Sequence, residues 1–175
     1  MIDMEPPVHI GEKNAGDFRF AIVVSQWNAF LTSRLVDGAI DALESNGATQ
    51  SEIEVFKVPG AFELPLACLK AAETGRFDAV IALGLVLRGE TPHFDFVAGE
   101  AARGVTRASL MTGVPVLFGV ITADTVGQAV DRCGSKSANK GYEAAMAAIE
   151  IVDLYRKMEL EQGVKGKEKK LSHGV

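Results

Sequence analysis

An apolar run, Ala79 to Leu87, leads directly into a turn and then into a helical pattern, and few folds accommodate this succession. An unbroken apolar run is typical of a strand that is covered on both faces, as in a parallel sheet. The turn reads R-G-E-T-P-H, and Pro92 fits the first position of a helix, with Thr91 as its expected cap. The turn therefore lies at the carboxyl end of a buried strand, where open α/β sheets bind ligands.

This turn also has the properties of an anion site with a proton carrier beside it. The free backbone N–H groups and the positive dipole end of a helix N-terminus favour a bound anion. His93, the only histidine away from both ends of the chain, lies here. Because an imidazole exchanges protons near neutral pH, His93 is a candidate general acid or base.

The rest of the chain alternates between strands and helices. Strands are expected at 18–25, 53–58, 78–87 and 114–122, and helices at 32–45, 64–74, 92–112, 124–132 and 139–157. This alternation predicts an α/β fold, with helices on both faces of a parallel sheet. Residues 1–17 are expected to form an arm, 18–158 a single domain and 159–175 a disordered, charged tail. Gly99 and Gly104 weaken the third helix, unless a neighbouring helix approaches closely there.

Composition and charge exclude several classes of function. The chain is 47% hydrophobic and 23% charged, which is ordinary for a globular protein, and its net charge of −5 argues against non-specific binding to nucleic acid or to anionic membranes. No apolar run is long enough to span a membrane, and the N-terminus does not resemble a signal peptide. Cys68 and Cys133 lie in no metal-type spacing, so we expect reduced thiols in a cytoplasmic protein and no metal site.

The loop that follows each of the four predicted strands, which we call the strand exit, carries residue types that suit a binding site. In chain order these are Trp27 and Asn28, Gly60 to Glu63, Arg88 to His93, and Thr122 to Thr125 with Arg132 and Lys136 beyond. Because the exits of parallel strands lie along one edge of the sheet, we expect these residues to lie close together.

Each of these residues also has a purely structural explanation. Trp27 can shield the end of the sheet, and Glu63 can be a first-turn carboxylate that the helix dipole favours. Arg132 can complement the dipole at a helix C-terminus, while Lys136 and Lys140 can simply be solvated. The chain contains no Walker loop, Rossmann glycine fingerprint or nucleophile elbow. Taken singly, the residues leave the function open.

Taken together, five segments resemble the 6,7-dimethyl-8-ribityllumazine synthase family. They are S-Q-W-N, V-P-G-A-F-E-L-P, R-G-E-T-P-H-F-D-F-V, V-L-F-G-V-I-T-A-D-T and R-C-G-S-K-S-A-N-K-G, in the order and spacing of that family, from about Phe18 to Met158. The resemblance implies a flavodoxin-like three-layer α/β/α sandwich with a four-stranded parallel sheet. It also implies a transferase of riboflavin biosynthesis that uses no metal or organic cofactor. Such an enzyme condenses 5-amino-6-(D-ribitylamino)uracil with 3,4-dihydroxy-2-butanone 4-phosphate and releases phosphate and water.

The resemblance assigns roles to individual residues. The catalytic proton carrier is His93. The pyrimidine and its ribityl chain are held by residues from several loops: Trp27, Asn28, Ala61, Phe62, Glu63, Val86, Phe118 and Lys140. The phosphate is held by backbone N–H groups of Glu90 and Thr91 and by the fork of Arg132. Phe118 and Lys140 come from the neighbouring subunit.

Three positions depart from the usual pattern of the family, although none of them removes a functional group. Trp27 replaces a phenylalanine, and the larger indole can still stack but narrows the pocket. Glu90 puts a carboxylate beside the proposed phosphate, so its side chain must point away. Cys133 replaces a small residue, with no role that we can assign.

The resemblance also implies a homo-oligomer, either a pentamer or a 60-subunit shell, with active sites between subunits and small-molecule substrates. The N-terminal arm would pair with a neighbour's sheet edge, and the helix with Gly99 and Gly104 would pack around the pentamer axis. The absence of an insertion at 134–141 favours the shell. Two other functions are less favoured. A non-catalytic flavin- or lumazine-binding shell protein would be indicated by the loss of His93 or Arg132, and both are present. A signalling receiver needs an acidic cluster at the strand exits, where the sequence offers only Asp124, with Glu63 nearby.

Overall fold

The centre of the molecule is a parallel β-sheet of four strands. The computed structural model describes residues 6–171, with side chains described for residues 6–160. The strands pair in the order β2-β1-β3-β4, with these bounds: β1 (Phe20–Ser25), β2 (Ile53–Val58), β3 (Ala79–Leu87) and β4 (Val116–Ala123). Strand β3 is buried almost throughout, which explains its unbroken apolar sequence, whereas the edge strands β2 and β4 are partly exposed.

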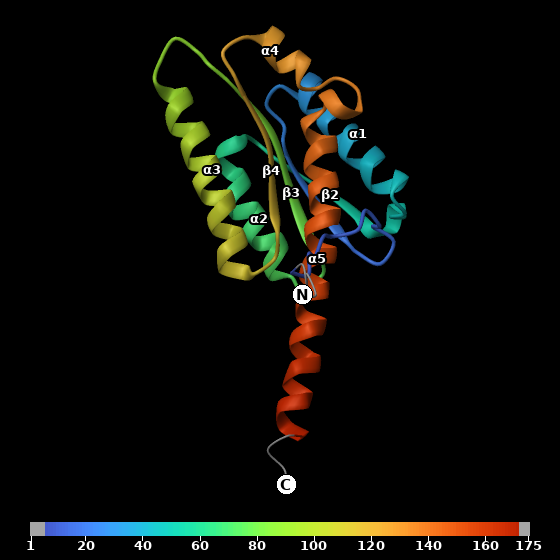
Figure 1. Cartoon of the computed structure of the whole chain (residues 1–175). Helices are drawn as coiled ribbons and strands as arrows, with labels where there is room; N and C mark the ends of the chain where they lie inside the picture. The colour runs from blue at the N-terminus through green and yellow to red at the C-terminus, as the bar shows by residue number, and fades with distance from the viewer. Residues whose placement is uncertain (1–5, 172–175) are drawn as a thin grey trace.

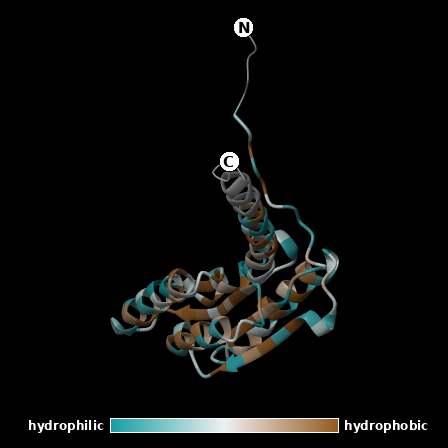
Figure 2. Ribbon diagram, turned by 90° about the horizontal axis from the view of Figure 1, so that it is seen from below, coloured by the Kyte–Doolittle hydropathy of each residue, from teal (hydrophilic) through white to brown (hydrophobic). Residues whose placement is uncertain are grey.

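Helices cover both faces of the sheet (Figure 1), and the strands between them are mostly hydrophobic (Figure 2). One face carries α1 (Ala29–Ser45) and α5 (Lys140–Leu171), and the opposite face carries α2 (Leu64–Glu73) and α3 (His93–Thr112). Short helices complete the chain: η1 (Gln50–Glu52), η2 (Ala61–Glu63), α4 (Val126–Asp131) and η3 (Lys136–Ala138). The prediction of a flavodoxin-like three-layer α/β/α sandwich with a four-stranded parallel sheet is confirmed.

The loop between β1 and α1 is shorter than the sequence predicts. Helix α1 begins at Ala29 rather than Thr32, because Asn28 adopts a left-handed conformation (φ 60°) and its carbonyl accepts the N–H of Thr32 (3.0 Å). Asparagine tolerates this conformation better than most residues. Trp27 and Asn28 are therefore held directly at the edge of the sheet.

Helices α2 and α3 approach each other closely at Gly104. A Cβ atom on Gly104 would lie 2.5 Å from the Cβ of Pro65 and 2.6 Å from its Cγ, which is closer than packed atoms tolerate. At Gly99 the nearest atom would be the flexible guanidinium of Arg103, at 3.1 Å in the same helix. Close helix approach therefore explains Gly104 and does not explain Gly99.

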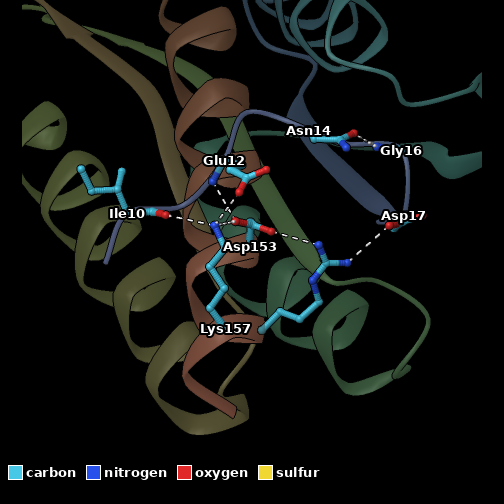
Figure 3. Close-up of polar contacts among 8 residues, drawn as sticks. Ile10, Glu12, Asn14, Gly16, Asp17, Asp153 and Lys157 are labelled. Atoms are coloured by element: carbon cyan, nitrogen blue, oxygen red, sulfur yellow. Dashed lines mark hydrogen bonds and ion pairs between the residues drawn. The ribbon is translucent and has the colours of Figure 1, made fainter. Parts of the chain in front are cut away.

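The described part of the arm, residues 6–17, has no helix or strand and is tied to the middle of α5 (Figure 3). The N–H of Glu12 donates to Oδ2 of Asp153 (2.7 Å). Ala15 is fully buried and belongs to the core between the sheet and α1 and α5. The packed domain therefore begins slightly before Phe18, where the sequence predicts its start.

Helix α5 continues to Leu171, past Met158, where the sequence predicts the end of the domain and the start of a disordered tail (Figure 1). The residues that follow Met158 are mainly Glu, Lys, Leu and Gln, which are strong helix formers, and a helix that packing has already nucleated extends at little cost. Residues 1–5 of the predicted arm and 172–175 of the predicted tail lie outside the described residues. None of the described helices is long and apolar enough to cross a membrane.

Candidate active site

The carboxyl ends of the strands lie together at one end of the sheet, because the strands are parallel and in register there. Ser25 pairs with Val58, and Leu87 pairs with Ala123. The N–H of Gln26 donates to the carbonyl of Val58 (2.8 Å), which ties the loop after β1 to the end of β2. The loops that the sequence singles out therefore converge on a common edge.

A cavity of about 710 Å³ opens at this edge, a size that suits a small-molecule ligand. Its wall contains eight of the residues that the family resemblance implies: Trp27, Asn28, Ala61, Phe62, Glu63, Val86, Thr91 and His93. These residues come from the exits of β1, β2 and β3. We refer to this space as the His93 cavity.

The loop after β2 gives the His93 cavity an aromatic rim with a carboxylate beside it. Gly60 donates its N–H to Oε2 of Glu63 (2.8 Å). Trp27 lies beside Gly60, since a Cβ on this glycine would be 3.9 Å from Cδ1 of the indole. Trp27 is 72% exposed, so it does not act as a shield for the sheet end. Within the described residues, Oε1 of Glu63 makes no hydrogen bond, which leaves it available to a ligand hydroxyl.

The third side of the His93 cavity is the start of α3. The helix begins at His93, Pro92 precedes it, and no side chain caps it, so the predicted cap by Thr91 is wrong. Its first N–H groups and the positive dipole end are therefore free for an anion. Thr91 and Gly89 line the cavity, whereas Glu90 lines no cavity that we describe.

Phe94 and Phe96 also line the His93 cavity, although the sequence assigned them no role. The signal for them is their position in the F-D-F segment that directly follows His93. Aromatic residues that border a candidate site offer flat apolar surface to a heterocyclic ligand.

A second cavity, of about 420 Å³, lies along the edge strand β4 and the start of α5. Its wall includes Phe118, Arg132 and Lys140, together with Glu143, which the sequence did not single out. Lys140 forms an ion pair with Glu143 in the same turn, and this i,i+3 spacing is the signal that could have found it. We refer to this space as the Arg132 cavity. Within one chain, His93 and Arg132 therefore open onto different cavities.

The chemistry available in the two cavities differs. The His93 cavity combines aromatic rings, a carboxylate, an imidazole and a helix N-terminus, and the Arg132 cavity combines two cations with a carboxylate. Cys133, which follows Arg132 in the sequence, is buried and lines neither cavity, and burial raises the pKa of its thiol. Among the described residues, no three His, Cys, Asp or Glu side chains are grouped to hold a metal ion.

Comparison with known proteins identifies the family. Residues 17–156 match the family model of 6,7-dimethyl-8-ribityllumazine synthase. The chain is 54% identical over 153 residues to the 6,7-dimethyl-8-ribityllumazine synthase of Syntrophus aciditrophicus (strain SB). The aligned residues make up 87% of this chain and 99% of the relative. It is 51% identical over 148 residues to the same enzyme of Chlorobium luteolum and 50% identical over 148 residues to that of Chlorobium phaeovibrioides, each covering 85% of this chain and 96% of the relative. Because the family model matches residues 17–156 and each relative is at least 50% identical over most of its length, the chain belongs to the 6,7-dimethyl-8-ribityllumazine synthase family.

Proposed function

We propose that two copies of the chain form each active site, one supplying the His93 cavity and the second supplying the Arg132 cavity. As a member of its family the chain is a transferase of riboflavin biosynthesis. It condenses 5-amino-6-(D-ribitylamino)uracil with 3,4-dihydroxy-2-butanone 4-phosphate to give 6,7-dimethyl-8-ribityllumazine, phosphate and water. The observation that carries the two-copy proposal is that one chain holds the two sets of residues in separate cavities. A reaction between two substrates needs both sets in one place.

The His93 cavity binds the pyrimidine. The exposed indole of Trp27 stacks on the ring, as aromatic pairs prefer offset stacking. The free Oε1 of Glu63 accepts hydrogen bonds from ribityl hydroxyls. The rest of the ribityl chain lies against the remaining wall of the cavity, formed by Asn28, Ala61, Phe62 and Val86.

His93 carries the protons of the reaction. An amine adds to the ketone, phosphate leaves by elimination, and a second amine closes the ring, and each of these steps moves a proton. A general acid or base typically contributes ~10²–10⁴-fold, and holding two substrates together supplies roughly 7–11 kcal/mol of the barrier. A non-catalytic binding protein of the same fold would need neither His93 nor Arg132, and the presence of both favours catalysis.

The phosphate of the second substrate binds between the start of α3 and the partner copy. Backbone N–H groups of Glu90 and Thr91 and the uncapped helix N-terminus contact one side of it. The guanidinium fork of Arg132, from the partner copy, contacts the other side, because its geometry matches phosphate oxygens. Phe118 and Lys140 enter the site together with Arg132, since they line the same cavity.

The assembly is a homo-oligomer, which we propose to be a pentamer or a 60-subunit shell. The Arg132 cavity lies on the open edge strand β4, where Phe118 is 43% exposed, and a second copy would cover it. In the arm, Val8 and Ile10 are exposed and lie on either side of His9, an apolar-polar-apolar spacing that suits a strand added to a neighbour's sheet edge. The two cysteines are unpaired and buried, which fits our proposal of a cytoplasmic enzyme.

Mixing two inactive variants tests the shared site. His93→Ala and Arg132→Ala each remove one half of the site, so assemblies of either variant alone are expected to turn over slowly. When the two are co-expressed in equal amounts, about a quarter of the interfaces combine two intact halves, because the subunits distribute at random around a closed ring. We therefore expect co-expression to restore about a quarter of the wild-type lumazine formation, measured by fluorescence.

The control is co-expression of two variants of the same half, His93→Ala with His93→Gln, which cannot complement each other because neither supplies the imidazole. Size-exclusion chromatography with light scattering establishes that the mixed particles have the mass of the wild-type assembly. Activity in the mixture that stays at the level of the single variants would show that His93 and Arg132 do not act at one shared site.

A further inference from the structure

Arg88 is the first residue after β3, and its side chain lines neither cavity. Its backbone N–H donates to the carbonyl of Ala123 (2.9 Å), which extends the β3–β4 ladder by one step. An arginine this close to a proposed phosphate site is a natural candidate for a phosphate ligand. Its side-chain contacts indicate a different role.

The guanidinium of Arg88 is held by two carboxylates and a ring. Its Nε donates to Oδ1 of Asp124 (2.7 Å), and its Nη2 and Nη1 donate to the two oxygens of Asp95 (3.2 and 3.4 Å). The group also lies over the ring of Phe94, 4.1 Å from the centroid. The hydrogen bonds that Arg88 donates to Asp124, and then those to Asp95, raise the pKa of Arg88, so it stays charged. The fork is therefore already occupied and is not available to a phosphate.

These contacts join the residue before the loop 89–92 to the residues that follow it. Phe94 and Asp95 belong to the first turn of α3, directly after His93, and four residues separate Arg88 from His93. In this part of the described chain, Glu90 and Thr91 make no side-chain hydrogen bonds and no side chain caps α3. The side chain of Arg88 therefore contacts Phe94 and Asp95 at the far end of this loop.

We propose that Arg88 is a positioning residue for this reaction, because by joining Asp95 to Asp124 it holds the first turn of α3 against the sheet edge and so places the imidazole of His93. The inference rests on the proposed role of His93. The contact with Asp124 anchors the guanidinium to the loop after β4, and the Asp124 N–H is itself bonded to Oε1 of Gln128 (2.9 Å). A displacement of about 1 Å at a catalytic group can cost ~10²-fold in rate.

The first test compares variants of the full-length assembly, with each substrate varied in turn while the other is saturating. Arg88→Ala is expected to lower kcat by roughly 10- to 100-fold and to leave the KM for the pyrimidine within about twofold, because the Trp27 wall is untouched. Arg88→Lys keeps the charge without the fork and should recover only part of kcat. Asp95→Asn, which keeps the shape of the side chain, should lower kcat in the same direction.

Arg76 offers a matched control. It makes the same kind of contacts, donating to both oxygens of Glu54 (3.0 and 3.2 Å) and lying 4.8 Å from the ring centroid of Phe77, and it lines neither cavity. Arg76→Ala is expected to leave kcat unchanged. A fall in kcat equal to that of Arg88→Ala would show a general effect of losing such a contact and would overturn the inference.

A double variant separates this inference from the proposed function. If Arg88 acts through His93, then Arg88→Ala with His93→Ala is no slower than His93→Ala alone. Effects that multiply, or an unchanged kcat in Arg88→Ala, would overturn the positioning role while leaving His93 as the proton carrier. Unchanged turnover in His93→Ala would overturn the role of His93 and, with it, the role of Arg88.

Discussion

The carboxylate of Asp153 is buried, at 3% exposed, against the ammonium of Lys157, with Oδ2 and Nζ 2.8 Å apart. The same carboxylate accepts hydrogen bonds from the N–H of Glu12 (2.7 Å) and from Arg156 (3.0 Å) (Figure 3). The hydrogen bond from Lys157, followed by that from Glu12, lowers the pKa of Asp153 to about 2. The arm and α5 are therefore joined through a carboxylate that stays ionised under most conditions.

Replacing Asp153 with Asn should destabilise the protein in a pH-dependent way. The pKa is about 2 in the folded chain, against an ordinary value of 3.8, so the ionised carboxylate contributes stability above about pH 4 and loses it as the pH falls toward 2. We expect Asp153→Asn to cost about 1–2 kcal/mol near pH 7, with a difference from wild type that shrinks below pH 4. Urea unfolding at several pH values measures this, and the exposed Asp37→Asn is the control. A difference that stays constant down to pH 2.5 would contradict the assignment.

Alanine should have opposite effects at the two glycines of α3. At Gly104 the new methyl group would overlap the ring of Pro65 in α2, which is backbone-anchored and cannot move aside, so we expect a loss of about 1–3 kcal/mol. At Gly99 it meets only the mobile end of Arg103, so the better helix propensity of alanine should stabilise the helix by up to ~1 kcal/mol. Unfolding free energies of the two variants measure the difference. Equal effects would mean that α2 and α3 do not pack as described.

Trp27 is expected to contribute to pyrimidine binding by stacking. Trp27→Ala should raise the KM for the pyrimidine ~10-fold, while Trp27→Phe should raise it less, because a smaller ring still stacks. The KM for the butanone phosphate should change little. Phe30→Ala is the matched control, since Phe30 is a similarly exposed aromatic residue that lines neither cavity. A pyrimidine KM that does not respond to Trp27→Ala would leave the indole with no role in the pocket.

Arg132 is expected to act on the phosphorylated substrate. Removing a charge-assisted, forked contact should cost about 1.5–3 kcal/mol, so Arg132→Ala should raise the KM for the butanone phosphate by roughly 10- to 100-fold. The KM for the pyrimidine should change far less. Lys136→Ala removes a nearby exposed cation that lines neither cavity and serves as the control. Equal changes for both substrates would assign the phosphate to another group.

The sequence predicts the sheet well because its signals are local. Strand β3 is an unbroken apolar run and β2 alternates, so their bounds are read to within a residue. The prediction that Thr91 caps α3 is wrong, because Pro92 precedes the first helical residue and no side chain caps the helix. The early start of α1 was missed for a similar reason, since it depends on the left-handed backbone of Asn28, which residue types only weakly encode.

Periodicity and contiguous motifs were sufficient to predict the succession of strands and helices along the chain, the family and the residue types that carry the chemistry. Which of these residues line the same cavity follows instead from the three-dimensional packing of the chain. It separated Arg132 from His93 within one chain, and it turned the guanidinium of Arg88 toward Asp95 and Asp124 instead of toward a ligand. The order of the strands within the sheet, the direction of each side chain and the contacts between neighbouring strand ends arise from packing between segments that are far apart in sequence. No local pattern therefore specifies them.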